Sequence, residues 1–320
     1  MAECRVIRYS DEWYGKLKAY MHKTFPTYSK AYIEYCILHS KDRESSIIVV
    51  DGNGVVVGCH LYYCVNALMD GEVIETQWGH DTYLDDNYRK EIGVDFLLAR
   101  KKIPAFGVGL TDTNAKMRKL MKSVFLKGVY NYYIITPLIV CSPFQKIFHS
   151  KKQVKDIDCL NMNGITFKRV HSPEEMTILN GGFWFKGYNE LDFIRDAEFI
   201  NYRFFNCKVH DYKVYASKDS YFVVRESTYR GMPAMMLSDF RYNPASPESA
   251  TILLKAVRKL AVKSGYGLLY FVCGDKNVEE YFRRKIHFKT SLDFITSYKI
   301  SPETTFTLCG GDSDAEFLKV

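Results

Sequence analysis

The chain has 320 residues, of which 47% are hydrophobic and 25% are charged, a composition typical of a folded globular protein. This length predicts two domains of about 150 residues each. The formal net charge is +7, but lysine and arginine are spread along the chain instead of gathered in runs, which argues against nucleic-acid binding and favours attraction of an anionic cofactor.

The cysteine pattern and the start of the chain indicate a reducing, intracellular setting. Nine cysteines occur without any CxxC spacing, mostly single among apolar residues, so we expect reduced and buried thiols. Residues 1–14 lack the apolar segment of a signal peptide, and no stretch reaches the ~20 apolar residues of a membrane span. The histidines show no metal-ligand spacing. We expect a cytoplasmic protein with no metal site and no membrane insertion.

The first half of the chain predicts an antiparallel sheet that leads into a βαβ crossover. The expected order of elements is β-α-α-β-β-β-α-β-α-β. The Asp51–Gly54 turn, "DGNG" between two apolar runs, is a strong hairpin signal, and Met69–Gly71 marks a second turn. The expected elements are a strand at 4–8, helices at 12–23 and 29–39, strands on both sides of Asp51–Gly54, a strand at 72–84, a helix at 93–102 and a strand-helix-strand unit at 105–140.

The second half repeats this plan more loosely, after a polar, lysine-rich stretch that we interpret as a linker at 151–164. Asp112-Thr113-Asn114 ends an apolar strand and opens a helix, and so does Asp275-Lys276-Asn277; eleven residues after each Asn stands a Phe, Phe125 and Phe288. Matching motifs in matching element orders favour an internal duplication. We therefore expect a first domain at 1–150, a second at 165–302 and a C-terminal tail at 303–320.

The element order, the Tyr88-Arg89 turn that enters a helix, and Asn114 at the start of the next helix resemble the GNAT superfamily of N-acetyltransferases. The internal duplication resembles a tandem GNAT pair. The resemblance implies an α/β (α+β) fold with two GNAT-like domains, each a mixed, mostly antiparallel sheet flanked by helices. The first copy is expected to be catalytic. The second is expected to be non-catalytic, because "SDFRYNPASPESATILLKA" has no glycine and two prolines, which lack amide donors.

In the family, a turn with the pattern Arg or Gln, two residues, Gly, one residue, then Gly or Ala holds the pyrophosphate of acetyl-CoA through backbone amides at a helix N-terminus. Here Arg89 matches and Arg89 and Lys90 add charge, but Ile92 and Val94 stand where the pattern has glycine, with Gly93 between them. A working cradle and a turn that no longer binds both stay open. The cofactor-binding residues that the resemblance implies are Thr82, Tyr83, Leu84, Arg89, Lys90, Glu91, Ile92, Gly93, Val94 and Asn114, the last of which is equally explained as a plain helix cap.

The resemblance implies direct attack of an amine on the thioester, with a base on the strand "VIETQWGHDTYL". His80 is our first candidate because an imidazole titrates near neutral pH, against the alternative of a hydrogen-bonded structural histidine. Glu75 is second, and Asp81 third because alternation places it on the other face, an order that a bulge would reverse. The positions where the family often has a tyrosine acid hold Leu120 and Met121, so the acid stays unassigned.

We therefore expect an acyl-CoA-dependent N-acyltransferase, with acetyl-CoA or another acyl-CoA as co-substrate and a small amine as acceptor; an amino sugar, an amino acid and a polyamine all fit. One alternative is a catalytically silent GNAT-like module that binds a ligand or a partner protein. Another is transfer of a long acyl chain from an acyl carrier protein, whose acidic surface would meet Arg89-Lys90 and Arg100–Lys102.

Overall fold

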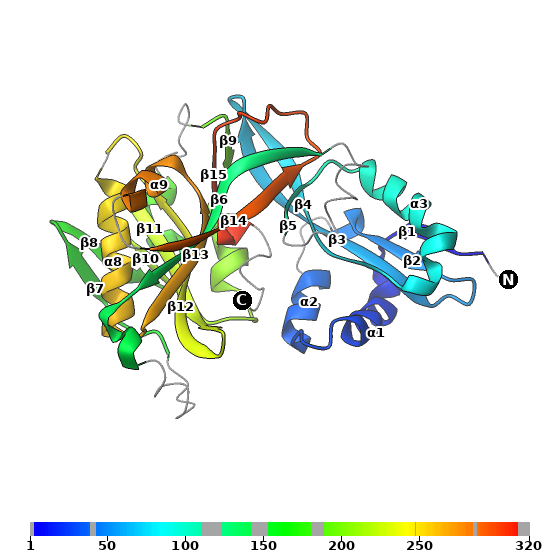
Figure 1. Cartoon of the computed structure of the whole chain (residues 1–320), viewed down its shortest axis with the longest axis horizontal. Helices are drawn as coiled ribbons and strands as arrows, with labels where there is room; N and C mark the ends of the chain where they lie inside the picture. The colour runs from blue at the N-terminus through cyan, green and yellow to red at the C-terminus, as the bar shows by residue number, and fades with distance from the viewer. Residues whose placement is uncertain are drawn as a thin grey trace. The chain divides into compact units, whose positions relative to one another are not determined.

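The computed structural model describes residues 3–38, 43–109, 123–141, 153–180, 189–246, 248–283 and 287–312. Contacts divide the chain into two compact units, which Figure 1 shows with their helices and strands. Unit 1 consists of Met1–Asn66, Glu75–Phe125 and Phe294–Pro302, and unit 2 of Ala67–Ile74, Leu126–Asp293 and Glu303–Val320.

Unit 1 is a mixed sheet with helices on both faces. Neighbouring strands follow the order β1-β2-β3-β4-β5-β14; β1, β2 and β3 pair antiparallel, whereas β4 and β5 pair in parallel at Trp78 and Phe106. Figure 1 shows α1 and α2 on one side of the strands and α3 on the other. The elements are β1 (Arg5–Arg8), α1 (Tyr14–Thr24), α2 (Lys30–Leu38), β2 (Ile47–Val50), β3 (Val56–Met69), β4 (Glu72–Leu84), a 3-10 turn η3 (Asp86–Tyr88), α3 (Arg89–Lys101), β5 (Phe106–Gly109) and the end of β14 (Phe288–Thr296).

Turn chemistry and aromatic packing fix this sheet. β3 and β4 are joined at Asp70 and Gly71, whose φ angles of 52° and 84° are those that two-residue hairpin turns require. Behind β4 and β5, Trp78, Phe106 and Phe294 stack with ring centroids 5.7–5.8 Å apart. These rings hold the parallel β4–β5 pair, and the candidate site is built on β4.

Unit 2 is a second mixed sheet, with neighbouring strands in the order β14-β6-β13-β12-β11-β10-β8-β7. β12 and β13 are parallel, while β11–β12, β10–β11 and β6–β13 are antiparallel. Helices α8 and α9 pack on one face of this sheet over a large apolar core. The elements are β6 (Val124–Ile135), β7 (Cys159–Met162), β8 (Ile165–Val170), α6 (Thr177–Asn180), β9 (Leu191–Phe193), α7 (Ala197–Ile200), β10 (Tyr212–Ala216), β11 (Ser220–Tyr229), β12 (Met232–Tyr242), α8 (Ser249–Lys263), β13 (Leu268–Gly274), α9 (Lys276–Arg283) and β15 (Phe306–Cys309).

The expected class, an α+β protein with mixed sheets flanked by helices, is confirmed. The units differ from the expected segments 1–150 and 165–302, because strand pairing joins distant parts of the chain. β6 pairs with β13 in unit 2, and residues 294–302 return to unit 1. The expected tail at 303–320 contains β15, which pairs with β13 and β9. The helix expected around Asn114 lies outside the described residues. In the part of the chain that the structure describes, no helix has the length and apolarity to cross a membrane.

Candidate active site in unit 1

Two titratable side chains meet inside β4. Alternation along the strand buries Trp78 and His80 on one face. Asp81, which alternation would place on the other face, has a left-handed backbone with φ 44°, rare for residues other than glycine. His80 and Asp81 are consequently both buried, and His80 Nδ1 lies 2.8 Å from a carboxylate oxygen of Asp81. The expectation that Asp81 faces away from His80 is wrong, because this one residue breaks the alternation.

The Asp81 carboxylate is held from the helical side by three further groups. Tyr28 donates its hydroxyl to Oδ1 at 2.9 Å, and Tyr32 donates to Oδ2 at 3.4 Å. The thiol of Cys36 also donates to this carboxylate. Burial by itself raises the pKa of Asp81, but the hydrogen bonds from His80, Tyr28 and Cys36 hold it below the ordinary value of 3.8. Asp81 is therefore an ionised carboxylate at neutral pH.

These three partners were missed in the sequence. Tyr28, Tyr32 and Cys36 follow one another at intervals of four residues, which places Tyr32 and Cys36 on one face of α2 and Tyr28 just before it. That spacing shows that they share a face. It does not show that this face meets β4, so only the fold brings them to Asp81.

A second histidine borders the pair. His60, on β3, lies with Nδ1 2.5 Å from the hydroxyl of Thr82. Burial lowers the pKa of His60, and the nearby positive charge of Arg100 lowers it further, so this ring is neutral. A Cβ at Gly79 would lie 2.7 Å from His60 Nε2, which explains the glycine between Trp78 and His80.

Glu75, the second candidate base, is not part of this cluster. It is exposed on β4 five residues before His80, about 16 Å along the strand at the rise of an extended chain. The structure thus brings together His80 and Asp81 but leaves Glu75 apart from them.

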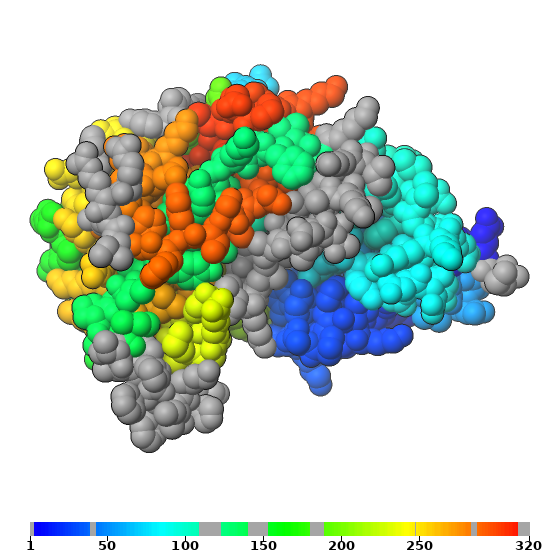
Figure 2. Space-filling model, viewed as in Figure 1, coloured from blue at the N-terminus to red at the C-terminus, as the bar shows by residue number. Residues whose placement is uncertain are grey.

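Apart from Asn114, the expected cofactor residues lie where β4 passes into α3, in the part of unit 1 that Figure 2 shows in cyan. Arg89 is exposed, donates Nε to the carbonyl of Leu84 at 3.2 Å and pairs with Asp86 at 2.8 Å. Its guanidinium also lies 6.0 Å from the centre of the Tyr83 ring. Lys90 is exposed beside it. The positive charge expected at this turn is present, but Asp86 partly neutralises it.

The start of α3 is a regular helical turn. The helix begins at Arg89, whose amide donates to the carbonyl of Asp86, and the amides of Gly93 and Val94 are used in helical hydrogen bonds, so free donors are confined to the remaining residues of the first turn. Ile92 is buried in the core and Val94 is 70% exposed, while the Glu91 carboxylate accepts the backbone amide of Cys4 at 3.4 Å. Asn114 lies outside the described residues. A diphosphate at this end would therefore meet the Arg89–Glu91 turn.

Three side chains around the His80–Asp81 pair have the spacing of metal ligands. The thiol of Cys36, a ring nitrogen of His80 and a carboxylate oxygen of Asp81 all lie within 4.8 Å of one another. The donor set suits a transition metal. The carboxylate, however, already accepts hydrogen bonds from Tyr28, Tyr32 and Cys36, so metal binding would displace protons and donors that now satisfy it.

Comparison with known proteins supports the fold. No family model matches the sequence, and no curated protein matches it. Among solved structures, a probable N-acyltransferase from Enterococcus faecalis V583 matches with TM-score 0.61 and 13% identity, over 92% of this chain and 72% of that one. A GCN5-related N-acetyltransferase from Anabaena variabilis matches with TM-score 0.61 and 11% identity over the same shares. Saccharomyces cerevisiae N-myristoyltransferase, solved with bound myristoyl-CoA, matches with TM-score 0.57 and 9% identity, over 94% of this chain and 84% of that one. The expected GNAT-type fold is confirmed, and it extends over residues of both units.

Proposed function

Since the chain has the fold of GCN5-related N-acetyltransferases and of N-myristoyltransferase, we propose that it is an acyl-CoA-dependent N-acyltransferase that acts on a small amine. The observation that carries the proposal is the His80–Asp81 pair on β4, assembled by the left-handed residue Asp81 and held by α2. Unit 1 would do the chemistry. Unit 2 would be structural or shape the acceptor site.

The pair has the features of a general base. An ionised carboxylate accepts hydrogen bonds only, so the proton of His80 lies on Nδ1 and Nε2 is the basic nitrogen. Nε2 takes a proton from the acceptor ammonium, and Asp81 stabilises the imidazolium that forms. The free amine then attacks the thioester carbonyl and the amide C–N bond forms, while the nitrogen loses its second proton to solvent. The C–S bond breaks with release of thiolate, which is protonated by solvent or by an acid.

Acetyl-CoA is the first donor to test, with the backbone at Thr82–Leu84 and the first turn of α3 as its binding region. A long-chain acyl-CoA is favoured by a separate observation, the likeness over 94% of the chain to a transferase solved with myristoyl-CoA. A silent binding module is favoured by the Arg89–Asp86 pair and the regular start of α3, which leave fewer donors for a diphosphate.

Calorimetric titration of the full chain with acetyl-CoA, myristoyl-CoA and free CoA separates these functions. We expect saturable binding of one acyl-CoA per chain, weakened by Arg89→Gln and unchanged by Arg258→Gln, which removes an exposed arginine of α8. Absence of binding by every acyl-CoA at millimolar concentration would favour the silent module or a carrier-bound donor.

The catalytic role of His80 is tested by thiol release in the presence of amino acids, amino sugars and polyamines. We expect His80→Gln to lower turnover by about 100-fold or more with little change in acyl-CoA affinity. Unchanged turnover would remove His80 as the base and return it to a structural role.

A further inference from the structure

Unit 2 contains a cavity of about 220 Å³ at the C-terminal ends of its two parallel strands. β12 and β13 pair at Met235↔Leu269 and Met236↔Tyr270, and further along β13 its partner is β15. Ligands of open α/β sheets commonly bind where neighbouring strands diverge at their carboxyl ends. The cavity is lined by Asn189, Phe240, Arg241, Tyr242, Pro244, Asp275, Lys276, Asn277, Thr305 and Thr307.

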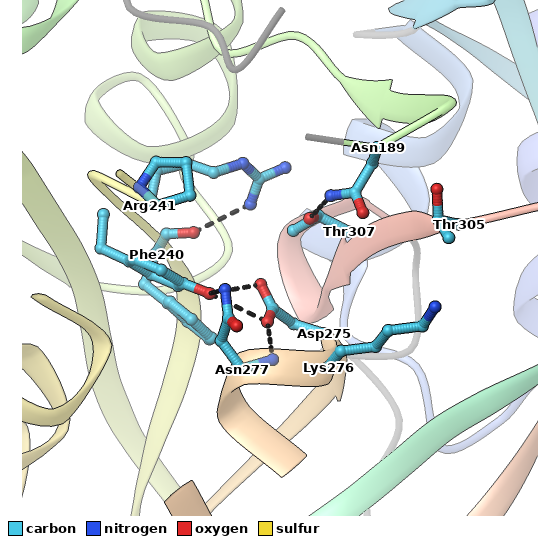
Figure 3. A pocket seen from close by; sticks show the side chains of 10 residues that line it. Asn189, Phe240, Arg241, Asp275, Lys276, Asn277, Thr305 and Thr307 are labelled. Atoms are coloured by element: carbon cyan, nitrogen blue, oxygen red, sulfur yellow. Dashed lines mark hydrogen bonds between the residues drawn. The ribbon is translucent and has the colours of Figure 1, made fainter. Parts of the chain in front are cut away.

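Figure 3 shows the groups of this pocket. Phe240, Tyr242 and Pro244 supply apolar surface to its lining. The amide of Asn189 donates to the Thr307 hydroxyl at 2.6 Å, and the Thr305 hydroxyl donates to the Glu190 carboxylate at 3.4 Å. Apolar surface combined with a few polar groups is the usual composition of a small-molecule site.

The carboxylate of Asp275 is held by hydrogen bonds and can accept a further one. Its Oδ1 accepts the amides of Asn277 at 2.8 Å and Val278 at 3.2 Å. The Tyr242 hydroxyl lies 2.9 Å from Oδ1 and 2.8 Å from Oδ2, and with Oδ1 already accepting two amides its single proton goes to Oδ2. A carboxylate oxygen can accept two hydrogen bonds, so Oδ2 has room for another donor. The charge of Asp275, directly before the start of α9, disfavours a phosphate there.

Cationic groups lie beside this anion. Lys276 is exposed, and Figure 3 shows its ammonium group on the same side of the view as Thr305. Arg241 is 1% exposed at the back of the pocket, and its Nε has no partner in the described part of the chain. The pocket thus holds an anion and a cation on adjacent residues, with apolar surface beside them.

We propose that this pocket binds a free α-amino acid with an apolar or aromatic side chain. The ammonium group donates to Asp275 Oδ2, the carboxylate meets the Lys276 ammonium, and the side chain packs on Phe240, Tyr242 and Pro244. The volume suits a ligand of this size. Every residue involved belongs to unit 2, so the inference does not depend on the activity proposed for unit 1.

The test is calorimetric titration of the full chain with L-phenylalanine and L-leucine, followed by two analogues of phenylalanine. Phenethylamine lacks the carboxylate and N-acetyl-L-phenylalanine lacks the ammonium group. We expect saturable binding of at least one amino acid, and both analogues should bind at least about tenfold more weakly than phenylalanine. Absence of amino-acid binding at millimolar concentration, or equal binding of the analogues, would overturn the inference.

Two variants locate the binding. Asp275→Asn keeps the side-chain oxygen that caps α9 but removes the charge, and Lys276→Gln changes an exposed residue that the fold does not need. Each should weaken amino-acid binding by about tenfold, whereas Lys263→Gln, an exposed lysine on α8, should have no effect. Unchanged affinity in Lys276→Gln would place any amino-acid site elsewhere. Acetyl-CoA titration of the same variants reports on unit 1 separately.

Discussion

His80 and Asp81 are adjacent in one strand, yet their side chains form a hydrogen bond of 2.8 Å in the interior of unit 1. In a regular strand they would point to opposite faces. The left-handed conformation of Asp81 brings both to one side, where Tyr28, Tyr32 and Cys36 surround the carboxylate. A backbone conformation that costs about 1 kcal/mol or more is maintained at the place where the two titratable groups meet.

Asp81→Asn tests the energetic weight of this arrangement. The substitution removes a buried negative charge that several donors share, and we expect it to destabilise the protein by about 2–4 kcal/mol at pH 7. Because the folded pKa of Asp81 lies below its ordinary value of 3.8, this stabilisation is present above pH 3.8 and is lost as the pH falls through the folded pKa. Urea unfolding of both proteins from pH 7 to pH 3 measures the difference.

The difference between wild type and Asp81→Asn should therefore narrow only below pH 3.8. A constant difference at every pH would mean that the charge of Asp81 contributes nothing and that only its shape matters. Tyr28→Phe is the matched control: it removes one donor and leaves the charge, so it should cost about 1 kcal/mol.

The sequence predicted the strand and both titratable residues of the site, but not that the side chains of His80 and Asp81 contact each other. Alternation identified the buried side of β4 through Trp78 and His80, since a period of two is a local property. The φ angle of Asp81 has no such signature, because aspartate is compatible with both conformations. The partners on α2 required knowledge of which helix covers which strand, which is set by the whole fold.

The same difference between local and long-range information explains why the fold class was predicted and the bounds of the two units were not. Element order and turn residues such as Asp70-Gly71 act locally and predicted the α+β class. The pairing of β6 with β13, and of β15 with β13 and β9, joins residues far apart in the chain. The stretch at 303–312 reads as a polar tail, yet Asp312 is fully buried beside Arg195.

Arg195 organises a buried charge cluster in unit 2. Its guanidinium bonds both oxygens of Asp239, at 2.9 and 3.0 Å, and also binds Asp312, all without exposure to solvent. Arg195→Met leaves two buried carboxylates without this partner, so we expect a loss of about 3–5 kcal/mol in the free energy of unfolding. Arg195→Lys should recover only part of it, because lysine cannot bind Asp239 through two parallel donors. Chemical denaturation of the three proteins checks this; equal stability of Arg195→Met and wild type would contradict it.

Asp192 lies in the same cluster, but its ionisation should destabilise the protein instead of stabilising it. Three buried carboxyls, those of Asp192, Asp239 and Asp312, form ion pairs with two guanidiniums, those of Arg195 and Arg241. Burial raises the pKa of Asp192 to about 6, despite the opposing effect of Arg241. A raised carboxyl pKa means that wild-type stability falls as the pH rises from 3.8 to about 6.

Asp192→Asn imitates the protonated carboxyl and lacks this loss. Relative to wild type, the variant should therefore gain up to about 3 kcal/mol between pH 4 and pH 7, the equivalent of a two-unit shift. Thermal or urea unfolding at both pH values gives the comparison. A variant whose relative stability is the same at pH 4 and pH 7 would show that Asp192 is ionised throughout.

The start of α3 offers a prediction about the cofactor. Asp86 is exposed and pairs with Arg89 at the turn where we propose that acyl-CoA binds. Asp86→Asn removes a negative charge and releases Arg89, so acetyl-CoA should bind about two- to fivefold more tightly, in line with the weight of an exposed ion pair. Asp95→Asn, on the same helix but further from its start, is the control and should change affinity less. Weaker or unchanged binding in Asp86→Asn would argue that the diphosphate does not bind at this turn.

The close packing of β13 against β15 yields the last prediction. A Cβ at Gly274 would lie 2.5 Å from the ring of Phe306 and 3.0 Å from Val129. Gly274→Ala should therefore destabilise the protein by about 1–3 kcal/mol through overpacking, and Phe306→Leu in the same chain should restore part of that loss. Gly15→Ala is the matched control, because nothing lies within 4 Å of its added Cβ inside α1, where alanine should stabilise the helix by about 0.5–1 kcal/mol. A double-mutant cycle by urea unfolding measures the coupling; additive effects of Gly274→Ala and Phe306→Leu would mean that the ring does not limit this position and that β15 packs less closely on β13.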